Sequence, residues 1–298
     1  MLGSGHEHPG RTVSYLDRIR ACHRWNPADY LPFLVDGVAL GAVDPAFRER
    51  LTAFPEVFTA AAGHLALVPA LDSFDARSAA LAEVTAALRA EGAFPNWRGE
   101  DYPVALAWGR PPLFRMERAA VPRFGLPAYG VHVNGFLRGP EGLEMWIGKR
   151  ARTKQTAPGK LDHITAGGQP YGLGLTENVI KECAEEAGIP AELAATAVPV
   201  GAVRYRCTRP EGLRNDVAFC FDLELPSDFR PENTDGEVES FERWPVARVL
   251  ERLRDTTDFK FNVALVILHF AVRHGVLSPD SEPEYQAIVE GLAGRLSE

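Results

Sequence analysis

Cysteine is scarce in this sequence, with four among 298 residues. They are Cys22, Cys183, Cys207 and Cys220, and no two of them form a CxxC pair. No histidine stands at zinc-finger spacing from any of them. Because a structural zinc site or a disulfide scaffold needs such patterns, we expect neither, and we predict four reduced thiols in ordinary packing.

Long apolar runs and an excess of positive charge are also missing. No run approaches the roughly 18 to 20 apolar residues of a membrane-spanning helix, and residues 1–10 lack the basic start and apolar stretch of a secretory signal. Forty acidic residues against 32 lysines and arginines give a net charge of -8, which disfavours attraction to a nucleic acid polymer or an anionic membrane. We therefore expect a cytoplasmic protein whose partner is neither of these.

The composition is that of a folded globular protein, with 46% hydrophobic and 24% charged residues. Its length favours two domains over one. Two prolines and a glycine between residues 122 and 127 interrupt the pattern, so we place a boundary there. We predict a small α+β domain over residues 1–124 and a second domain over residues 125–298.

Hydrophobic periodicity and turn residues predict the elements of both domains. In the first domain we expect a helix within 13–25, strands over 31–40 around an Asp36-Gly37 turn, a helix capped by Asp44, a strand or hairpin over 57–68, and a helix from Ser73 or Asp75 to about Arg89. In the second we expect a hairpin of 129–137 and 143–148, strands over 198–207 and 217–225 joined by a loop, and helices over 246–253, 263–274 and 282–296.

The most informative segment is an acidic helix expected over Thr176–Ala187, with the threonine as its N-cap. A rotation of 100° per residue places Glu182, Glu185 and Glu186 within one arc of about 100°. Apolar residues occupy the opposite side, so the helix can pack on a sheet while three carboxylates face one place. A glycine pair at 167–168 precedes the helix and allows close approach of the backbone.

Three like charges at this spacing weaken a helix by about 0.2–0.5 kcal/mol per pair unless a cation lies among them. Hard cations such as Mg²⁺ prefer carboxylate oxygens, and a rigid helix can supply several at once. The acidic arc therefore indicates a metal site. A solvated acidic face is the alternative that the three glutamates alone leave open.

The segment from residue 167 to residue 189 resembles the Nudix box, G-x5-E-x7-R-E-U-x-E-E-x-G-U, where U is aliphatic. KECAEEAGI at 181–189 aligns with the second half of the box, and Gly167 aligns with its first glycine. Leu173, Lys181 and Cys183 stand where the box has glutamate, arginine and an aliphatic residue. In the family, the replaced acid and arginine mainly brace the loop and the helix. Glu177 precedes Lys181 by four residues, so we expect an ion pair that replaces part of this brace.

The resemblance implies a Nudix fold, which is an α/β/α sandwich with a mixed sheet, here preceded by the small α+β domain. It also implies a Mg²⁺ ion, or Mn²⁺ in its place. The ligands that it implies are Glu182, Glu185, Glu186 and the carbonyl of Gly167, all of which this sequence retains.

The sequence around the box extends the resemblance. The runs RTKQTAPGKLDHITAGGQPYG and NVIKECAEEAGIP are similar to a Nudix subgroup with an N-terminal domain of uncharacterised function, as are PFLVDGVALGAV and MERAAVPRFGLPAYGVHVNGF. The similarity covers most of residues 13–275. Eukaryotic members of the subgroup have been linked to thiamine diphosphate metabolism, including hydrolysis of damaged forms, so the resemblance implies this substrate class.

The chemistry that the resemblance implies is attack of water on a phosphorus atom of a small-molecule organic diphosphate, with Glu185 and Glu186 as catalytic residues. Cationic side chains clustered ahead of the box are candidates for binding the phosphate oxygens. They are Arg150, Arg152, Lys154 and Lys160.

Two acids outside the box, Glu237 and Glu239, are candidates for the base or for an additional metal ligand, and we prefer Glu239. They alternate as in a strand, so we expect both to point the same way. Tyr171 and Phe136 are weak candidates for contact with a thiazolium-type ring. The remaining candidates for chemistry are lone histidines that we interpret as structural: His132, His163, His269 and His274.

Other functions remain open. The protein could hydrolyse a nucleoside diphosphate derivative instead, or be a Nudix-fold isomerase of the isopentenyl diphosphate type. It could also sense a metabolite with weak or no hydrolysis, which Leu173 in place of the box glutamate suggests. A homodimer is one of the oligomeric states that we keep open.

The acidic arc leads to a first prediction, that Glu186→Gln lowers kcat for diphosphate hydrolysis by at least about 100-fold, because a charged metal ligand is lost. The measurement is Mg²⁺-dependent phosphate release by the folded variant. Undiminished turnover would refute the metal assignment.

Overall fold

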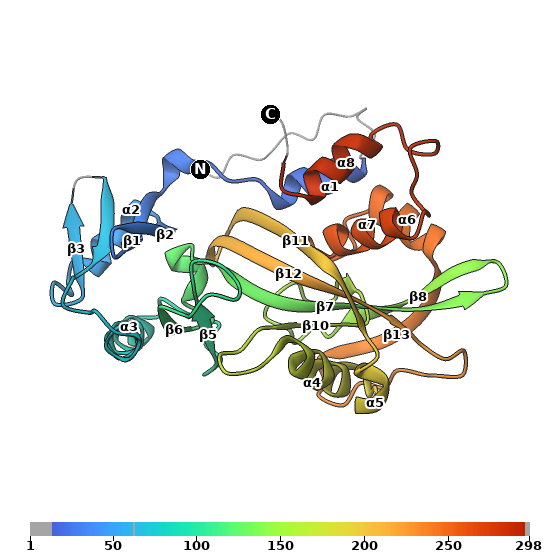
Figure 1. Cartoon of the computed structure of the whole chain (residues 1–298), viewed down its shortest axis with the longest axis horizontal. Helices are drawn as coiled ribbons and strands as arrows, with labels where there is room; N and C mark the ends of the chain where they lie inside the picture. Colours follow the sequence, from blue (N-terminus) through green and yellow to red (C-terminus); the bar gives the residue numbers. More distant parts are fainter. Residues whose placement is uncertain (1–13, 62, 296–298) are drawn as a thin grey trace.

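The computed structural model describes residues 14–61 and 63–295. A seven-stranded sheet lies between two layers of helices (Figure 1). Its strands are β7 (Ala128–Gly139), β8 (Gly142–Arg150), β9 (Leu161–Asp162), β10 (Thr165–Gly168), β11 (Val198–Arg209), β12 (Gly212–Glu224) and β13 (Val238–Pro245). One layer consists of α1 (Tyr15–Cys22), α6 (Val246–Asp255), α7 (Val263–Arg273) and α8 (Tyr285–Leu292), and the other of α4 (Leu175–Ala187) and α5 (Ala191–Ala194).

Strand β7 changes partner half-way along its length. The strand order is β11-β12-β7-β8-β13, and β12 runs parallel to β7. On the other edge of β7, residues 130–133 pair with β10, whereas residues 136–139 pair with β8. Gly135 lies between the two pairings, where an added Cβ would be 2.8 Å from Cγ2 of Ile164. The sheet therefore divides at Gly135, with β10 on one branch and β8 on the other.

Helix α7 is buried nearly all round, because it lies between the central sheet and the helices α1 and α8. Tyr15, Leu16, Ile19 and Cys22 of α1 belong to the same core as α7. The first helix of the chain therefore packs with the C-terminal helices, beyond the boundary that we place after residue 124. That boundary itself stays a prediction.

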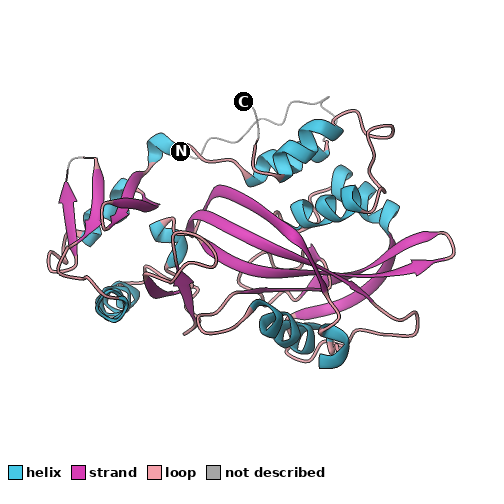
Figure 2. Cartoon of the chain, in the orientation of Figure 1, coloured by secondary structure: helices cyan, strands magenta, loops and turns pink. Residues whose placement is uncertain are grey.

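Residues 31–124 form what we call the N-terminal unit, with a four-stranded sheet ordered β2-β1-β4-β3 and a separate β5-β6 pair (Figure 2). The short helix η1 (Pro27–Asp29) precedes it. Its elements are β1 (Leu31–Val35), β2 (Val38–Val43), α2 (Pro45–Leu51), β3 (Phe58–Ala61), β4 (His64–Leu67), α3 (Phe74–Ala90), β5 (Asp101–Val104), β6 (Phe114–Glu117) and η2 (Val121–Phe124). Four phenylalanines, Phe33, Phe47, Phe58 and Phe124, pack in its core with ring centroids 5.2 to 6.2 Å apart. The unit thus has its own hydrophobic core.

The turn and cap residues of the N-terminal unit act as expected. Asp36 and Gly37 both have positive φ, 51° and 77°, which suits a two-residue hairpin turn. The side chain of Asp44 accepts a 2.8 Å hydrogen bond from the backbone N–H of Phe47 and so caps α2. Ser73, and not Asp75, caps α3.

Two local expectations are wrong. Helix α4 begins two residues earlier than expected, at Leu175, with Gly174 and not Thr176 as its N-cap. The carboxylate of Glu177 accepts the N–H of Gly174 at 2.8 Å, so the acid caps the helix. The loop expected between residues 207 and 217 is a tight turn at Pro210-Glu211, because both strands continue to it.

Two further observations concern membrane-spanning helices and the cysteines. Over residues 14–61 and 63–295, no helix is both long and apolar enough to cross a membrane. All four cysteines are free and buried. Residues 1–10, on which the expected location partly rests, lie outside the described residues.

Candidate active site

A cavity of about 690 Å³ lies between the central sheet and the N-terminal unit, and we call it the central cavity. Strands β7, β10, β11 and β12 line it on one side, together with Glu182 and Glu186 of α4. The N-terminal unit closes it with Arg98, Tyr102 and Arg118, and the loop after β8 reaches it with Lys154. Both halves of the chain therefore supply polar groups to one cavity.

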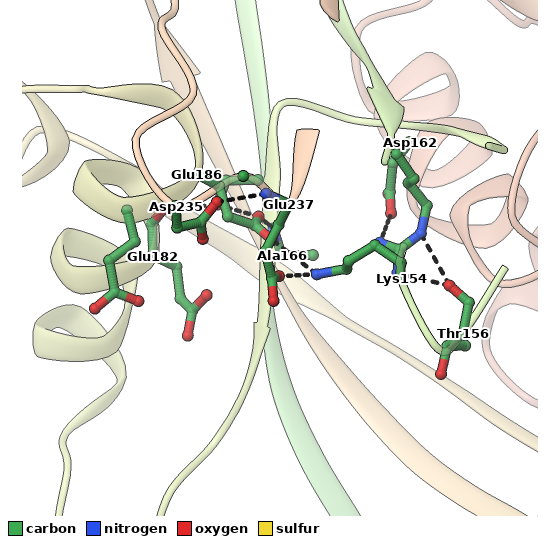
Figure 3. A network of polar contacts seen from close by, with 12 residues as sticks. Lys154, Thr156, Asp162, Ala166, Glu182, Glu186, Asp235 and Glu237 are labelled. Carbon is green, nitrogen blue, oxygen red and sulfur yellow. Dashed lines mark hydrogen bonds and ion pairs between the residues drawn. The ribbon is translucent and has the colours of Figure 1, made fainter. Parts of the chain in front are cut away.

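Helix α4 brings Glu182 and Glu186 to strand β10. Val179, Cys183 and Ala187 are fully buried in the core beneath the helix, which turns the acidic arc toward the strand. One carboxylate oxygen of Glu186 accepts hydrogen bonds from Thr165 Oγ1 at 2.8 Å and from the N–H of Ala166 at 2.9 Å. Figure 3 shows this carboxylate against the strand.

Glu182 lies against the first glycine of the pair. A Cβ added to Gly167 would be 2.1 Å from Cδ of Glu182, so only glycine leaves room for this carboxylate. On the opposite side, an added Cβ at Gly130 would be 2.8 Å from the Gly167 carbonyl oxygen. The glycine pair therefore allows a carboxylate and a neighbouring strand to approach the same backbone.

Glu185 occupies a different place from the other two glutamates. Its carboxylate is half exposed and lies 2.7 Å from Nζ of Lys181, which is also 3.1 Å from Glu182. It does not line the central cavity, whereas Glu182 and Glu186 do. Lys181 therefore pairs with Glu182 and Glu185 instead of forming the expected ion pair with Glu177.

Burial dominates the electrostatics of this end of the cavity. It raises the pKa of Glu186 to about 7, although the Ala166 N–H and the Lys154 ammonium act in the opposite direction. Burial also lowers the pKa of Lys154 to about 8 and raises the pKa of Glu182. The carboxylates are therefore held where an additional positive charge would stabilise their ionised forms.

The donor set fits a hard divalent cation. Within the part of the chain that the structure describes, no three His, Cys, Asp or Glu side chains converge into a complete site. Mg²⁺ usually binds through one or two carboxylates together with water and substrate phosphates, so a complete protein cage is not needed. Glu182, Glu186 and the Gly167 carbonyl supply oxygen donors at one end of the cavity.

Similarity to known proteins agrees with this geometry. Residues 14–128 match a family model described as a domain of unknown function (DUF4743). The chain is 42% identical to Nudix hydrolase 24, chloroplastic, of Arabidopsis thaliana over 273 residues, which cover 90% of this chain and 75% of that protein. The chain belongs to the Nudix hydrolase family. It is therefore a Nudix-type hydrolase acting on diphosphates, and the Nudix sandwich expected from the sequence is confirmed.

A second plant protein and a solved structure are also similar to this chain. Nudix hydrolase 20, chloroplastic, of Arabidopsis thaliana is 40% identical over 280 residues, covering 90% of this chain and 75% of that protein. The solved structure of DR0079 from Deinococcus radiodurans has a TM-score of 0.44 at 18% identity, covering 56% of this chain and 97% of that one. Because the two plant relatives are named chloroplastic, the cytoplasmic location of this Nudix protein stays a prediction.

The Nudix box lacks its first glutamate, and an amide pair braces the loop at that point. Asn178 donates a 2.8 Å hydrogen bond to the carbonyl of Gly168 and another of 3.1 Å to the side chain of Gln169. Gln169 in turn donates to the carbonyl of Leu173 at 2.5 Å. These bonds tie the glycine pair to the first turns of α4, which is the bracing function that the resemblance assigns to the missing acid.

Of the two acids outside the box, one lines the central cavity and the other does not. Glu237 lines the central cavity and forms an ion pair with Lys154, whose Nζ is also 3.8 Å from Glu186 (Figure 3). Glu239 is exposed, lies outside the cavity lining and pairs with Lys149 at 3.0 Å. A break in the β13 register between Val238 and Ser240 causes this separation. The expectation that both acids point the same way is therefore wrong.

Of the four cationic candidates, two line the central cavity and two do not. Lys154 lines the cavity. Arg150 lines it too, but its guanidinium is buried and pairs with Asp162 at 3.0 Å and with the carbonyl of Thr156 at 2.8 Å, so it also holds the loop. Arg152 is exposed and Lys160 donates to the carbonyl of Thr257 at 2.7 Å, and neither belongs to the cavity lining.

Several cavity residues carry no sequence signal that we recognised. Tyr102 reaches from β5 so closely to β10 that a Cβ on Gly168 would be 1.5 Å from its hydroxyl oxygen. Lys260 lines the cavity from the segment before α7 and is 3.4 Å from Asp162. Both residues lie far from the box in sequence, so local periodicity cannot reveal them. His132, which we expected to be structural, also lines the cavity.

The raised pKa of Glu186 predicts a pH-dependent stability of the metal-free protein. Between pH 4.5, its ordinary pKa, and about 7, the unfolded chain releases the Glu186 proton while the folded chain retains it. Wild type should therefore lose on the order of 2–3 kcal/mol relative to Glu186→Gln as the pH rises through this window. Denaturant unfolding of both proteins in EDTA measures the difference.

The exposed Glu192→Gln serves as the matched control and should follow wild type across the window. Adding Mg²⁺ at pH 8 should recover part of the loss in wild type but not in Glu186→Gln. A stability difference between wild type and Glu186→Gln that is flat from pH 4.5 to 7 would contradict the prediction.

Proposed function

We propose that the protein hydrolyses an organic diphosphate with Mg²⁺, or Mn²⁺ in its place, in the central cavity. The observation that carries the proposal is the contact of Glu182 and Glu186 with the backbone of β10 at one end of that cavity. Bound there, the cation would neutralise phosphate oxygens and polarise phosphorus. Lys154, Arg150 and Lys260 face the same end and supply the remaining positive charge for the phosphates.

Thiamine diphosphate or a damaged form of it is the substrate that we propose. The resemblance of the flanking sequences to the thiamine-related subgroup supports it, and the cavity volume is in the usual range for small-molecule sites. Tyr102, Tyr129 and Tyr205 line the cavity and offer aromatic surface to a heterocycle. Tyr171 stacks on Phe74 and Phe136 packs against Phe270, so these two earlier candidates do not contribute.

A small-molecule nucleoside diphosphate derivative is the second candidate substrate, because the carboxylate end of the cavity would bind only the diphosphate and not the group attached to it. A sensor without hydrolysis loses its main support, since Asn178 and Gln169 brace the loop that Leu173 leaves without its glutamate. We also propose Glu237, and no longer Glu239, as the additional acidic metal ligand. Glu185 lies outside the cavity lining and acts through its ion pair with Lys181.

The substrate proposal predicts Mg²⁺-dependent phosphate or monophosphate release from thiamine diphosphate or its oxidised analogues with kcat/KM above about 10⁴ M⁻¹s⁻¹. The screen includes nucleoside diphosphate sugars, dinucleoside polyphosphates, NADH and ADP-ribose. Glu186→Gln, purified in parallel, controls for contaminating phosphatases. Release from a nucleotide alone would overturn the thiamine assignment, and no release from any compound would overturn hydrolysis.

The separation of Glu237 from Glu239 predicts different effects of the same substitution. Glu237→Gln should lower kcat by at least about 10-fold and raise the Mg²⁺ concentration for half-maximal rate, because it removes a carboxylate next to Lys154 and Glu186. Glu239→Gln, on an exposed pair with Lys149, should stay within about twofold of wild type. Equal effects of the two substitutions would contradict the assignment.

A further inference from the structure

The central cavity is basic, although the chain as a whole carries a net charge of -8. Among the described residues, eight arginine and lysine side chains line it, against five aspartates and glutamates. An excess of positive charge inside a cavity raises the local concentration of anionic ligands. Each of these cations can offer its full charge to a ligand only where no carboxylate of the protein already balances it.

Seven of the eight cations already have a carboxylate partner. In the N-terminal unit the pairs are Arg50–Glu91, Arg118–Glu100 and Arg123–Asp44, with N–O distances of 2.6 to 3.8 Å. Around the sheet they are Arg150 and Lys260 with Asp162, Lys154 with Glu237, and Arg214 with Asp216. Arg98 is the exception, because within the part of the chain that the structure describes its side chain has no hydrogen bond or ion pair. Arg98 is also exposed, so a ligand in the cavity can reach its guanidinium.

A buried carboxylate holds the loop that carries Arg98. Glu117 is 5% exposed and accepts the backbone N–H groups of Arg98 at 3.0 Å, Gly99 at 2.9 Å and Glu100 at 3.1 Å. It also accepts the N–H of Ala119 at 3.2 Å. Three successive N–H groups that converge on one carboxylate fix the backbone of the loop. The unpaired guanidinium therefore belongs to a held segment of the N-terminal unit.

This loop lies next to the carboxylate end of the cavity. The carbonyl of Asp101 accepts the N–H of Tyr171, in the loop that follows β10, at 2.8 Å. Arg98 precedes Asp101 by three residues, so its backbone lies within about 11 Å of Asp101. Burial is the main cause of the raised pKa of Glu182, and the charge of Glu100 adds to it. Arg98 therefore reaches the cavity from a loop beside the proposed metal site.

A diphosphate needs a cation of this kind. Glu182 and Glu186 would already balance the two charges of a Mg²⁺ ion bound between them, and the seven paired cations are balanced by their own partners. The negative charge of the diphosphate therefore remains for a group that the protein has left unpaired. A guanidinium suits this task, because its planar set of N–H donors binds two phosphate oxygens at once.

We propose that Arg98 binds non-bridging oxygens of the substrate's diphosphate, and that Glu117 is the positioning residue that holds its loop. This inference rests on the proposed diphosphate hydrolysis. No covalent bond forms or breaks at Arg98. The charge on these oxygens is already present in the bound substrate, so the interaction is made before the reaction. The N-terminal unit would thus bind the substrate directly as well as close the cavity.

The test is Arg98→Gln, assayed on the diphosphate with the highest kcat/KM in the screen above. We expect KM to rise at least about 10-fold and kcat to stay within about threefold, because a charge-assisted interaction with the bound substrate is lost. Arg98→Lys keeps the charge without the planar donors, so its KM should lie between those of wild type and Arg98→Gln. Circular dichroism and thermal melting verify that both variants fold.

Arg110→Gln is the matched control, since Arg110 is an exposed arginine of the same unit outside the cavity lining. It should retain the wild-type KM. A KM of Arg98→Gln within about twofold of wild type, or a rise that Arg110→Gln reproduces, would overturn the proposal. The proposed function fails separately, when wild type itself shows no Mg²⁺-dependent release.

A second measurement needs no turnover. Methylenediphosphonate, whose bridging carbon resists hydrolysis, is titrated into each protein with Mg²⁺ in a calorimeter. The Kd should rise at least about 10-fold in Arg98→Gln and stay unchanged in Arg110→Gln. An unchanged Kd in Arg98→Gln would overturn the assignment to the diphosphate, because a rise in KM alone would then come from the rest of the substrate.

The positioning role of Glu117 has its own test. Glu117→Gln should raise KM by about the same factor as Arg98→Gln, because the loop loses the carboxylate that holds it. In the double variant KM should rise less than about twofold beyond that of Arg98→Gln, since both changes remove one interaction. Fully multiplicative effects would overturn the role of Glu117 in positioning Arg98.

Discussion

The contact of the Glu182 and Glu186 carboxylates with the backbone of β10 is the constraint on which the rest of the site depends. Glu186 is almost fully buried and is held by one backbone N–H and one hydroxyl, whereas Glu182 occupies the space that a side chain at residue 167 would fill. Burying carboxylates costs free energy unless a positive charge compensates. A cation bound between these carboxylates and a diphosphate, as we propose, would offset this cost.

The N-terminal unit is part of the same construction. Tyr102 fills the space above Gly168, and the N–H of Tyr171 donates to the carbonyl of Asp101 at 2.8 Å, so β5 holds the loop that follows β10. On the other side of the cavity, an added Cβ at Gly212 would be 2.3 Å from the carbonyl oxygen of Pro122, which shows how closely η2 approaches the β11–β12 turn. Because the Asp101–Tyr171 and Pro122–Gly212 approaches involve the backbone, the unit positions the cavity walls as well as covering them.

Much of this arrangement is predictable from local sequence. The Asp36-Gly37 turn, the Asp44 cap and the amphipathic α4 each depend on residues within a few positions of one another. The first two occur as expected, and α4 differs only at its start. Predictions failed where a distant contact or a single extra residue decides the outcome. The register break at the start of β13 sends Glu239 away from the cavity, and an alternation pattern cannot reveal such a bulge.

The same limit explains why Tyr102 and Lys260 escaped sequence analysis. Tyr102 lies on β5 and Lys260 lies just before α7, so both reach the cavity only through contacts between distant parts of the chain. Conversely, Leu173 looked like a defect in the box, yet Asn178 and Gln169 restore the brace with neutral amides. A neutral brace keeps the loop in place without adding a further carboxylate beside Glu182 and Glu186. The box is therefore better understood as a set of physical requirements, for oxygen donors, a close backbone and a braced loop, than as a fixed list of residues.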